Sequence, residues 1–158
     1  MRKLLVLVIL VLAVQPFSFS QSRTERPKLV VGIIVDQMRQ EYIYRFGERF
    51  GEGGFKRFTD QGFVMTNGHY NYIPTFTGPG HASVYTGTTP ATHGVIANNW
   101  YVKQLGRAIY CAEDSTVTNV AGSPGNGEIS PRNMLTTTIT DELRFATNKR
   151  SKVVGIAI

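Results

Sequence analysis

A continuous apolar run at Lys28 to Val35 is the feature that most constrains the fold of this chain. It reads KLVVGIIV, has the length of a strand and is rich in β-branched residues. Such a run suits a strand buried on both faces of a parallel sheet, because a half-exposed strand would alternate apolar and polar residues. A second buried strand, SKVVGIAI, is expected at residues 151–158.

Between these runs the apolar spacing predicts helices. One is expected after Asp36 and ends at Gly51, with Met38, Ile43, Phe46 and Phe50 on one side. Short helices are expected within residues 51–62 and at 81–86. A longer helix at 134–147 has an expected buried side that consists of Leu135, Ile139, Leu143 and Ala146. Residues 63–72 favour one or two strands, residues 90–94 a turn, and residues 103–133 loops with short strands.

The first twenty residues differ from the rest. Basic Arg2 and Lys3 are followed by an apolar run and by the small residues around Ser20. This order is typical of a secretory signal peptide, residues 1–20, cleaved after Ser20. A membrane anchor is the alternative, but the apolar run is short for a span. We therefore expect an exported protein, periplasmic or secreted, with no stable membrane anchor after cleavage.

Neither the net charge nor the cysteine content identifies a binding partner for this protein. Removal of residues 1–20 lowers the formal net charge from +6 to +4, and the densest basic cluster lies at 149–152. A solvated face explains such a cluster better than nucleic-acid binding does, because no aromatic interleaving or binding motif accompanies it. Cys111 is the only cysteine, so no disulfide forms within the chain.

The stretch IPTFTGPGHASVYTG, residues 73–87, combines two threonines with a Gly-Pro-Gly corner before small and apolar residues. Glycines permit unusual torsions and close approaches, and the N–H groups at a helix start favour an anion. A hydroxyl on this corner is therefore suited to meet a phosphate or sulfate. An ordinary turn is the alternative.

Asp36 follows directly after the first predicted strand. Clefts in open α/β sheets form beyond the carboxyl ends of the strands, so an acidic residue there is well placed to bind a ligand. Aspartate is also a common helix N-cap, and from the residues alone both interpretations stand.

Four blocks together carry a family resemblance: VVGIIVDQMR, YIPTFTGPGHASVYTG, PATHGVIANNWY and SKVVGIAI. In order and spacing they resemble the alkaline phosphatase superfamily, in particular its branch with a threonine nucleophile, the periplasmic alkaline phosphatases and type I phosphodiesterases. The resemblance spans residues 27–158. It implies an α/β fold with a doubly wound, mostly parallel sheet, helices on both faces, and a site for two zinc ions.

The resemblance also implies site residues. Thr77 matches the nucleophile and a zinc ligand, Asp36 matches a zinc ligand, and Thr75 matches a non-catalytic neighbour. Asn98 matches an asparagine that donates its amide to a phosphoryl oxygen, together with the backbone N–H at Gly78. Turn capping is the alternative for Asn98. A threonine hydroxyl needs a base or a metal to become a nucleophile, which agrees with zinc chemistry.

The three histidines lack ligand spacing. For His81 and His93 we expect hydrogen bonds to the backbone, and His69 has no motif around it.

The implied activity is zinc-dependent hydrolysis of small-molecule phosphate esters through a phospho-threonine. The remaining zinc ligands, and a Lys/Arg pair that contacts phosphate, lie downstream in the family. We therefore expect residues 21–158 to be the N-terminal portion of a catalytic domain and inactive alone. The alternatives are phosphodiester hydrolysis and a non-catalytic exported fragment. A sulfatase is disfavoured, because the nucleophile position holds neither cysteine nor serine.

Overall fold

The computed structural model describes residues 27–118, 120 and 127–157, so the predicted signal peptide lies outside the described residues. The chain divides into two units, Met1–Ile33 and Ile34–Ile158. The described helices and strands all belong to the second unit, in the order α2 (Glu41–Arg45), η1 (Gly47–Arg49), α3 (Phe55–Gln61), α4 (Thr77–Thr86), α5 (Pro90–His93), β1 (Asn99–Val102), β2 (Arg107–Tyr110), η2 (Pro131–Asn133) and α6 (Ile139–Ala146).

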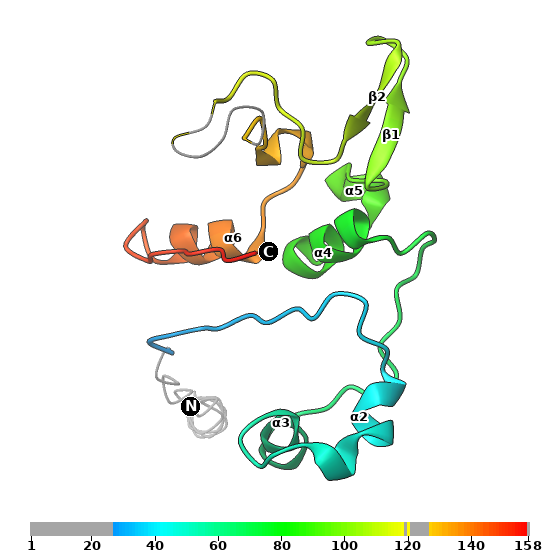
Figure 1. Cartoon of the computed structure of the whole chain (residues 1–158). Coiled ribbons are helices and arrows are strands. Elements are labelled where there is room, and N and C mark those ends of the chain that lie inside the picture. The colour runs from blue at the N-terminus through cyan, green and yellow to red at the C-terminus, as the bar shows by residue number, and fades with distance from the viewer. Residues whose placement is uncertain (1–26, 119, 121–126, 158) are drawn as a thin grey trace, which may run out of the picture. The chain divides into compact units, whose positions relative to one another are not determined.

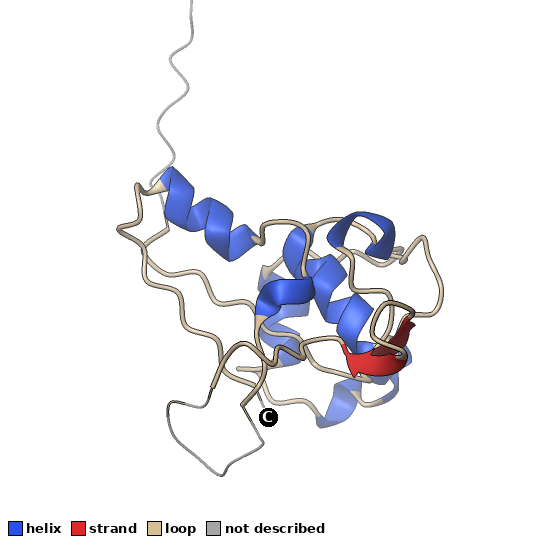
Figure 2. Cartoon of the chain, turned by 90° about the horizontal axis from the view of Figure 1, so that it is seen from above, coloured by secondary structure: helices blue, strands red, loops and turns tan. Residues whose placement is uncertain are grey.

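In the described part of the chain the sheet consists of two strands. β1 and β2 pair antiparallel, with Asn99 opposite Tyr110 and Val102 opposite Arg107. Helices and loops make up the remainder (Figure 2). Figure 1 shows α5 between the end of α4 and this hairpin, so α4, α5, β1 and β2 follow one another with only short connections. This part of the chain carries two of the three predicted side chains of the site.

Residues 28–35 and 151–157 are described as loops, so the described residues do not form the predicted parallel sheet. The predicted strands at 63–72 are also loop and turns. A strand exists only when its N–H and C=O groups pair with a neighbouring strand, whereas the apolar pattern reports only that the residues suit burial. The strand prediction at 63–72 is therefore wrong, and the described residues do not show the parallel strands predicted at 28–35 and 151–158, of which residue 158 lies outside the described ranges.

The predicted helix after Asp36 is reduced to α2 and the short η1. Gln37 has a φ of 55°, which places it in the left-handed region and delays the helix until Glu41. The prediction of α3 is confirmed. The turn expected at 90–94 is the one-turn helix α5, which has Pro90 at its first position and ends at Gly94 with a φ of 83°.

α6 is shorter than predicted because a capping box fixes its start. Thr138 accepts from the backbone of Asp141, and the Asp141 carboxylate accepts the N–H of Thr138 at 2.8 Å. The predicted burial of its apolar side is wrong for the described chain, since Ile139 is 63% exposed and Leu143 38%. Apolar spacing names the face that suits burial but does not supply a surface to cover it.

The described core is small and partly polar. Its fully or nearly buried residues are Pro79, Ala82, Ser83, His93, Val95 and Asp114. Five of them lie in α4, α5 or the turn after α5, close in sequence to the predicted nucleophile. None of the helices in the described ranges is long and apolar enough to cross a membrane.

Candidate functional site

Thr77 is the first residue of α4, and its side chain is exposed. The helix begins four residues earlier than the sequence predicts, because the Gly-Pro-Gly corner is its first turn. Pro79 fits there, since the N–H groups of the first turn have no partner within a helix in any case. The N-cap residue Phe76 makes no side-chain cap bond. The helix therefore starts directly at the hydroxyl-bearing residue.

Asn98 reaches this first turn from the position just before β1. Its Oδ1 accepts a hydrogen bond of 2.6 Å from the N–H of Gly78. Because a backbone N–H can only donate, the amide oxygen faces Gly78, and Nδ2 is the atom with donors to offer. The bond orients the Asn98 amide relative to Thr77.

Gly78 is needed for this close approach. A Cβ at residue 78 would lie 3.1 Å from Asn98 Oδ1, 3.2 Å from Cys111 Sγ and 3.3 Å from the carbonyl oxygen of Ala97. The segment after β2 also holds Asn98, since the Cys111 N–H donates to the Asn98 carbonyl at 2.8 Å. Glycine therefore allows two loops to pack against the start of α4.

Asp36 lies in a turn and is exposed. The N-cap of α2 is Gln40, which makes no side-chain cap bond, so the interpretation of Asp36 as a helix cap is wrong. Asp36, Thr77 and Asn98 line one pocket of about 440 Å³. The three side chains that the sequence singles out are thus brought together, although 62 residues separate Asp36 from Asn98 in the chain.

The same pocket has an apolar side and further polar groups. Met38, Tyr70 and Phe76 contribute apolar surface, and Thr75 and His81 also line it. Burial raises the pKa of Tyr70, with a contribution from neighbouring Tyr72. The Tyr70 hydroxyl stays neutral near pH 7 and donates a long bond of 3.4 Å to the carbonyl of Gly80.

The structure shows hydrogen bonds for each histidine. His81 Nδ1 lies 2.8 Å from the carbonyl oxygen of Thr77, to which it must donate. His93 accepts from the Val95 N–H at 3.1 Å, and His69 contacts Asn67. Both backbone bonds that the sequence predicts, for His81 and His93, are therefore present.

The donor set fits zinc in kind but not in number. A carboxylate and a hydroxyl are oxygen ligands that zinc accepts, and Asp36 and Thr77 supply them to one pocket. A catalytic zinc takes three protein ligands. Within the described residues, no group of three or more His, Cys, Asp or Glu side chains is close enough to hold a metal. This segment can therefore provide part of a zinc site.

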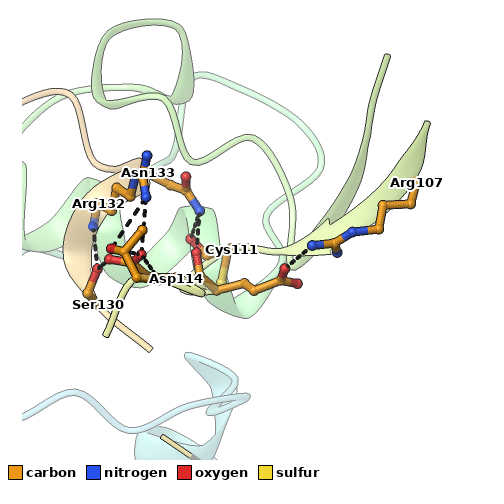
Figure 3. A network of polar contacts seen from close by, with 8 residues as sticks. Arg107, Cys111, Asp114, Ser130, Arg132 and Asn133 are labelled. Carbon is orange, nitrogen blue, oxygen red and sulfur yellow. Dashed lines mark hydrogen bonds and ion pairs between the residues drawn. The ribbon is translucent and has the colours of Figure 1, made fainter. Parts of the chain in front are cut away.

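A second polar network, which the sequence analysis missed, supports the loop that carries Cys111 (Figure 3). The buried carboxylate of Asp114 accepts from Ser130, from the backbone and hydroxyl of Thr116, and from Arg132 at 3.3 Å. The hydrogen bonds from Ser130 and Thr116 hold the pKa of Asp114 far below its usual range. Aspartate two residues before threonine is the local signal for this turn.

Asn133 joins this network to the site. Its Nδ2 donates to the Cys111 carbonyl at 3.1 Å, and Figure 3 shows the two residues side by side. The backbone of Cys111 in turn binds Asn98. The loop network thus holds the backbone of Asn98 through its carbonyl oxygen, while Gly78 binds its side-chain amide.

Comparison with known proteins decides the family. A protein-family model described as type I phosphodiesterase/nucleotide pyrophosphatase matches residues 30–156. The chain belongs to the type I phosphodiesterase/nucleotide pyrophosphatase family. This confirms the resemblance that the four sequence blocks predict.

Two curated relatives of this family member are alkaline phosphatases. The chain is 54% identical over 145 residues to alkaline phosphatase PhoV of Synechococcus elongatus, covering 92% of this chain and 26% of PhoV. It is 50% identical over 134 residues to alkaline phosphatase PafA of Elizabethkingia meningoseptica, covering 84% of this chain and 24% of PafA. The chain therefore spans about a quarter of the length of these relatives.

The fold of this family member also matches a solved structure. The crystal structure of wild-type alkaline phosphatase PafA superposes with a TM-score of 0.81 at 49% identity, covering 85% of this chain and 26% of that one. The chain therefore has the fold of the corresponding part of an alkaline phosphatase.

Proposed function

We propose that this chain supplies the nucleophile part of a zinc-dependent phosphatase that hydrolyses small-molecule phosphate monoesters. The observation that carries the proposal is the meeting of Asp36, Thr77 and Asn98 in one pocket at the start of a helix. The similarity to two alkaline phosphatases supports it.

In this proposal the Thr77 hydroxyl attacks phosphorus, the alcohol leaves, and a phospho-threonine forms that water then hydrolyses. Asn98 donates Nδ2 to a non-bridging phosphoryl oxygen, where negative charge is concentrated in the transition state. The resemblance assigns the Gly78 N–H to the phosphoryl oxygen, but in this structure that N–H donates to Asn98 Oδ1. Gly78 therefore serves substrate binding by orienting the Asn98 amide. The helix start adds a favourable electrostatic environment for the anion.

Asp36 and Thr77 would hold one of two zinc ions, with the remaining ligands supplied by residues beyond this segment. When bound, zinc would lower the pKa of the threonine hydroxyl and balance charge on the phosphoryl group. The exposed position of both side chains allows further ligands to reach the same pocket.

We further propose that, in the complete catalytic domain, the segment is part of a doubly wound, mostly parallel sheet with helices on both faces. Residues 21–158 would form the N-terminal portion of the catalytic domain. The signal peptide at residues 1–20 would direct it to the periplasm or the medium, without a membrane anchor and without a nucleic-acid partner.

The test is hydrolysis of an aryl phosphate by the full-length product of the gene, with zinc present. Thr77→Ala should lower kcat by about a thousandfold or more, because the nucleophile is lost. Thr75→Ala is the matched variant, two residues away in the same pocket, and should lose far less. Absence of hydrolysis by the wild type, or equal losses in both variants, would contradict the proposal.

Phosphodiester hydrolysis is the second candidate, because the matching family model is described as a phosphodiesterase. Comparison of kcat/KM for an aryl phosphate and its bis-aryl ester separates the two. We expect the monoester to be preferred. If neither ester is cleaved, the non-catalytic exported fragment is the remaining interpretation.

A further inference from the structure

A series of hydrogen bonds that begins at buried side chains ends on the first turn of α4. It starts at His93, whose side chain is fully buried. The Val95 N–H donates to His93 Nδ1 at 3.1 Å, and a backbone N–H cannot accept. Burial lowers the pKa of His93, which favours the neutral ring. In the neutral ring the proton is therefore on Nε2, which donates to Ser83 Oγ at 3.0 Å.

The remaining steps have a fixed direction as well. Ser83 accepts from His93, so its own proton goes to the Tyr72 hydroxyl oxygen at 2.8 Å. Tyr72 in turn donates to the carbonyl oxygen of Pro79 at 3.0 Å. The hydroxyls of Ser83 and Tyr72 each donate one hydrogen bond and accept one. Removal of either hydroxyl therefore leaves its neighbours with an unpaired donor or acceptor.

The turn that receives this chain needs external support. Residues 77–80 read Thr-Gly-Pro-Gly, and glycine and proline are the poorest helix formers. Phe76 provides no side-chain cap. Instead, side chains outside the turn bind its backbone, namely His81 at Thr77, Asn98 at Gly78 and Tyr72 at Pro79. Of these, the Tyr72 contact is the one backed by buried groups.

We propose that Tyr72 and Ser83, oriented by His93, are positioning residues that fix the first turn of α4 and thereby aim the Thr77 hydroxyl. This inference rests on the proposed role of Thr77 as the nucleophile. None of the three residues touches the phosphate. They act through the Pro79 carbonyl, two residues after Thr77.

The kinetic test uses Tyr72→Phe and Ser83→Ala in the full-length gene product, assayed with an aryl phosphate well below the melting temperature. Each should lower kcat about tenfold with KM changed less than about twofold, because the pocket is intact but the nucleophile is misaligned. The kcat of the double variant should be no lower than that of either single variant, since both substitutions break the same series of hydrogen bonds. Tyr44→Phe, at an exposed tyrosine, is the control with wild-type kcat.

A spectroscopic test does not depend on activity. The Gly78 N–H, in its 2.6 Å bond to Asn98, should give a downfield amide resonance in glycine-labelled protein. Tyr72→Phe should shift this resonance upfield, and Tyr44→Phe should not. A lower melting temperature with unchanged kcat would overturn the inference. An unchanged Gly78 resonance in both Tyr72→Phe and Ser83→Ala would do the same. If the wild type hydrolyses nothing, the proposed function fails. The Gly78 resonance still decides whether the hydrogen bonds from His93 through Ser83 and Tyr72 position the first turn of α4.

Discussion

At the scale of single residues, the site depends on one hydrogen bond between a glycine N–H and an asparagine oxygen. The 2.6 Å bond from Gly78 to Asn98 decides which end of the amide faces the pocket. The family resemblance of the four sequence blocks predicted Thr77, Asp36 and Asn98 as site residues, whereas the residues alone left a turn or a helix cap open for each. Neither could predict Tyr72, Ser83 or Asn133, because the partners of these side chains lie 7 to 22 residues away in sequence and meet them only in the folded structure.

Gly78→Ala should damage function more than stability. Alanine is favoured over glycine in a helix by about 1 kcal/mol, while the added Cβ would crowd Asn98 Oδ1 at 3.1 Å and Cys111 Sγ at 3.2 Å. Both of these side chains can yield, but only with loss of the Gly78–Asn98 bond. We expect kcat/KM to fall about tenfold or more with a small change in melting temperature. Gly80→Ala, where the nearest atom is 3.9 Å away, should lose less. An equal effect at both positions would contradict this account.

Asp36→Ala should reduce bound zinc without destabilising the metal-free protein. Asp36 is exposed and caps no helix, so its removal costs the fold little, whereas the proposed function makes it a zinc ligand. Metal analysis of the purified full-length product measures the zinc content. Asp60→Ala, at an exposed carboxylate on α3, is the control and should retain full zinc. Unchanged zinc in Asp36→Ala would remove Asp36 from the site.

At the scale of elements, α4 and α5 are joined through buried polar groups rather than through a large apolar core. Sequence reasoning predicted α3 and the turn at Gly94 because local residues determine them. It missed the early start of α4, since Gly-Pro-Gly normally breaks a helix and here side chains distant in sequence hold the turn. It overestimated the length of the helix after Asp36, because no residue pattern indicates that Gln37 adopts a left-handed conformation.

This junction should weaken in acid. Burial lowers the pKa of His93, so folding favours its neutral form. The stability it contributes is complete above the unfolded pKa of about 6.5 and is lost as the pH falls through the lower folded pKa. We therefore expect the melting temperature to fall between pH 7 and pH 5. In His93→Gln the melting temperature should fall less over this pH range. In His69→Gln, where the ring is exposed, it should fall as much as in the wild type. Equal slopes in both variants would refute the assignment.

At the scale of the whole molecule, the segment presents apolar side chains that a larger fold would cover. Ile73 is 92% exposed and Ile156 is 94% exposed. The chain spans about a quarter of the length of its relatives, and the apolar runs that predict strands are not paired in the described residues. A parallel sheet depends on strands from distant parts of a chain, so neither local sequence nor this segment defines it.

Residues 21–158 expressed alone should be poorly soluble and should show no zinc-dependent phosphatase activity. Two oxygen ligands cannot hold zinc tightly, and exposed apolar surface favours association. Size-exclusion chromatography and hydrolysis of an aryl phosphate with added zinc measure both properties. A soluble monomer whose turnover is abolished by Thr77→Ala would show that this segment contains a complete site.

The most direct test of the central claim is to find the phosphoryl group on Thr77. The full-length product would be mixed with an aryl phosphate, quenched in acid and digested, and the peptide that contains residues 73–87 sequenced by mass spectrometry. We predict one added phosphate on Thr77, with none on Thr75, and no phosphopeptide from Thr77→Ala. Phosphate on a different residue, or wild-type hydrolysis by Thr77→Ala, would contradict the account.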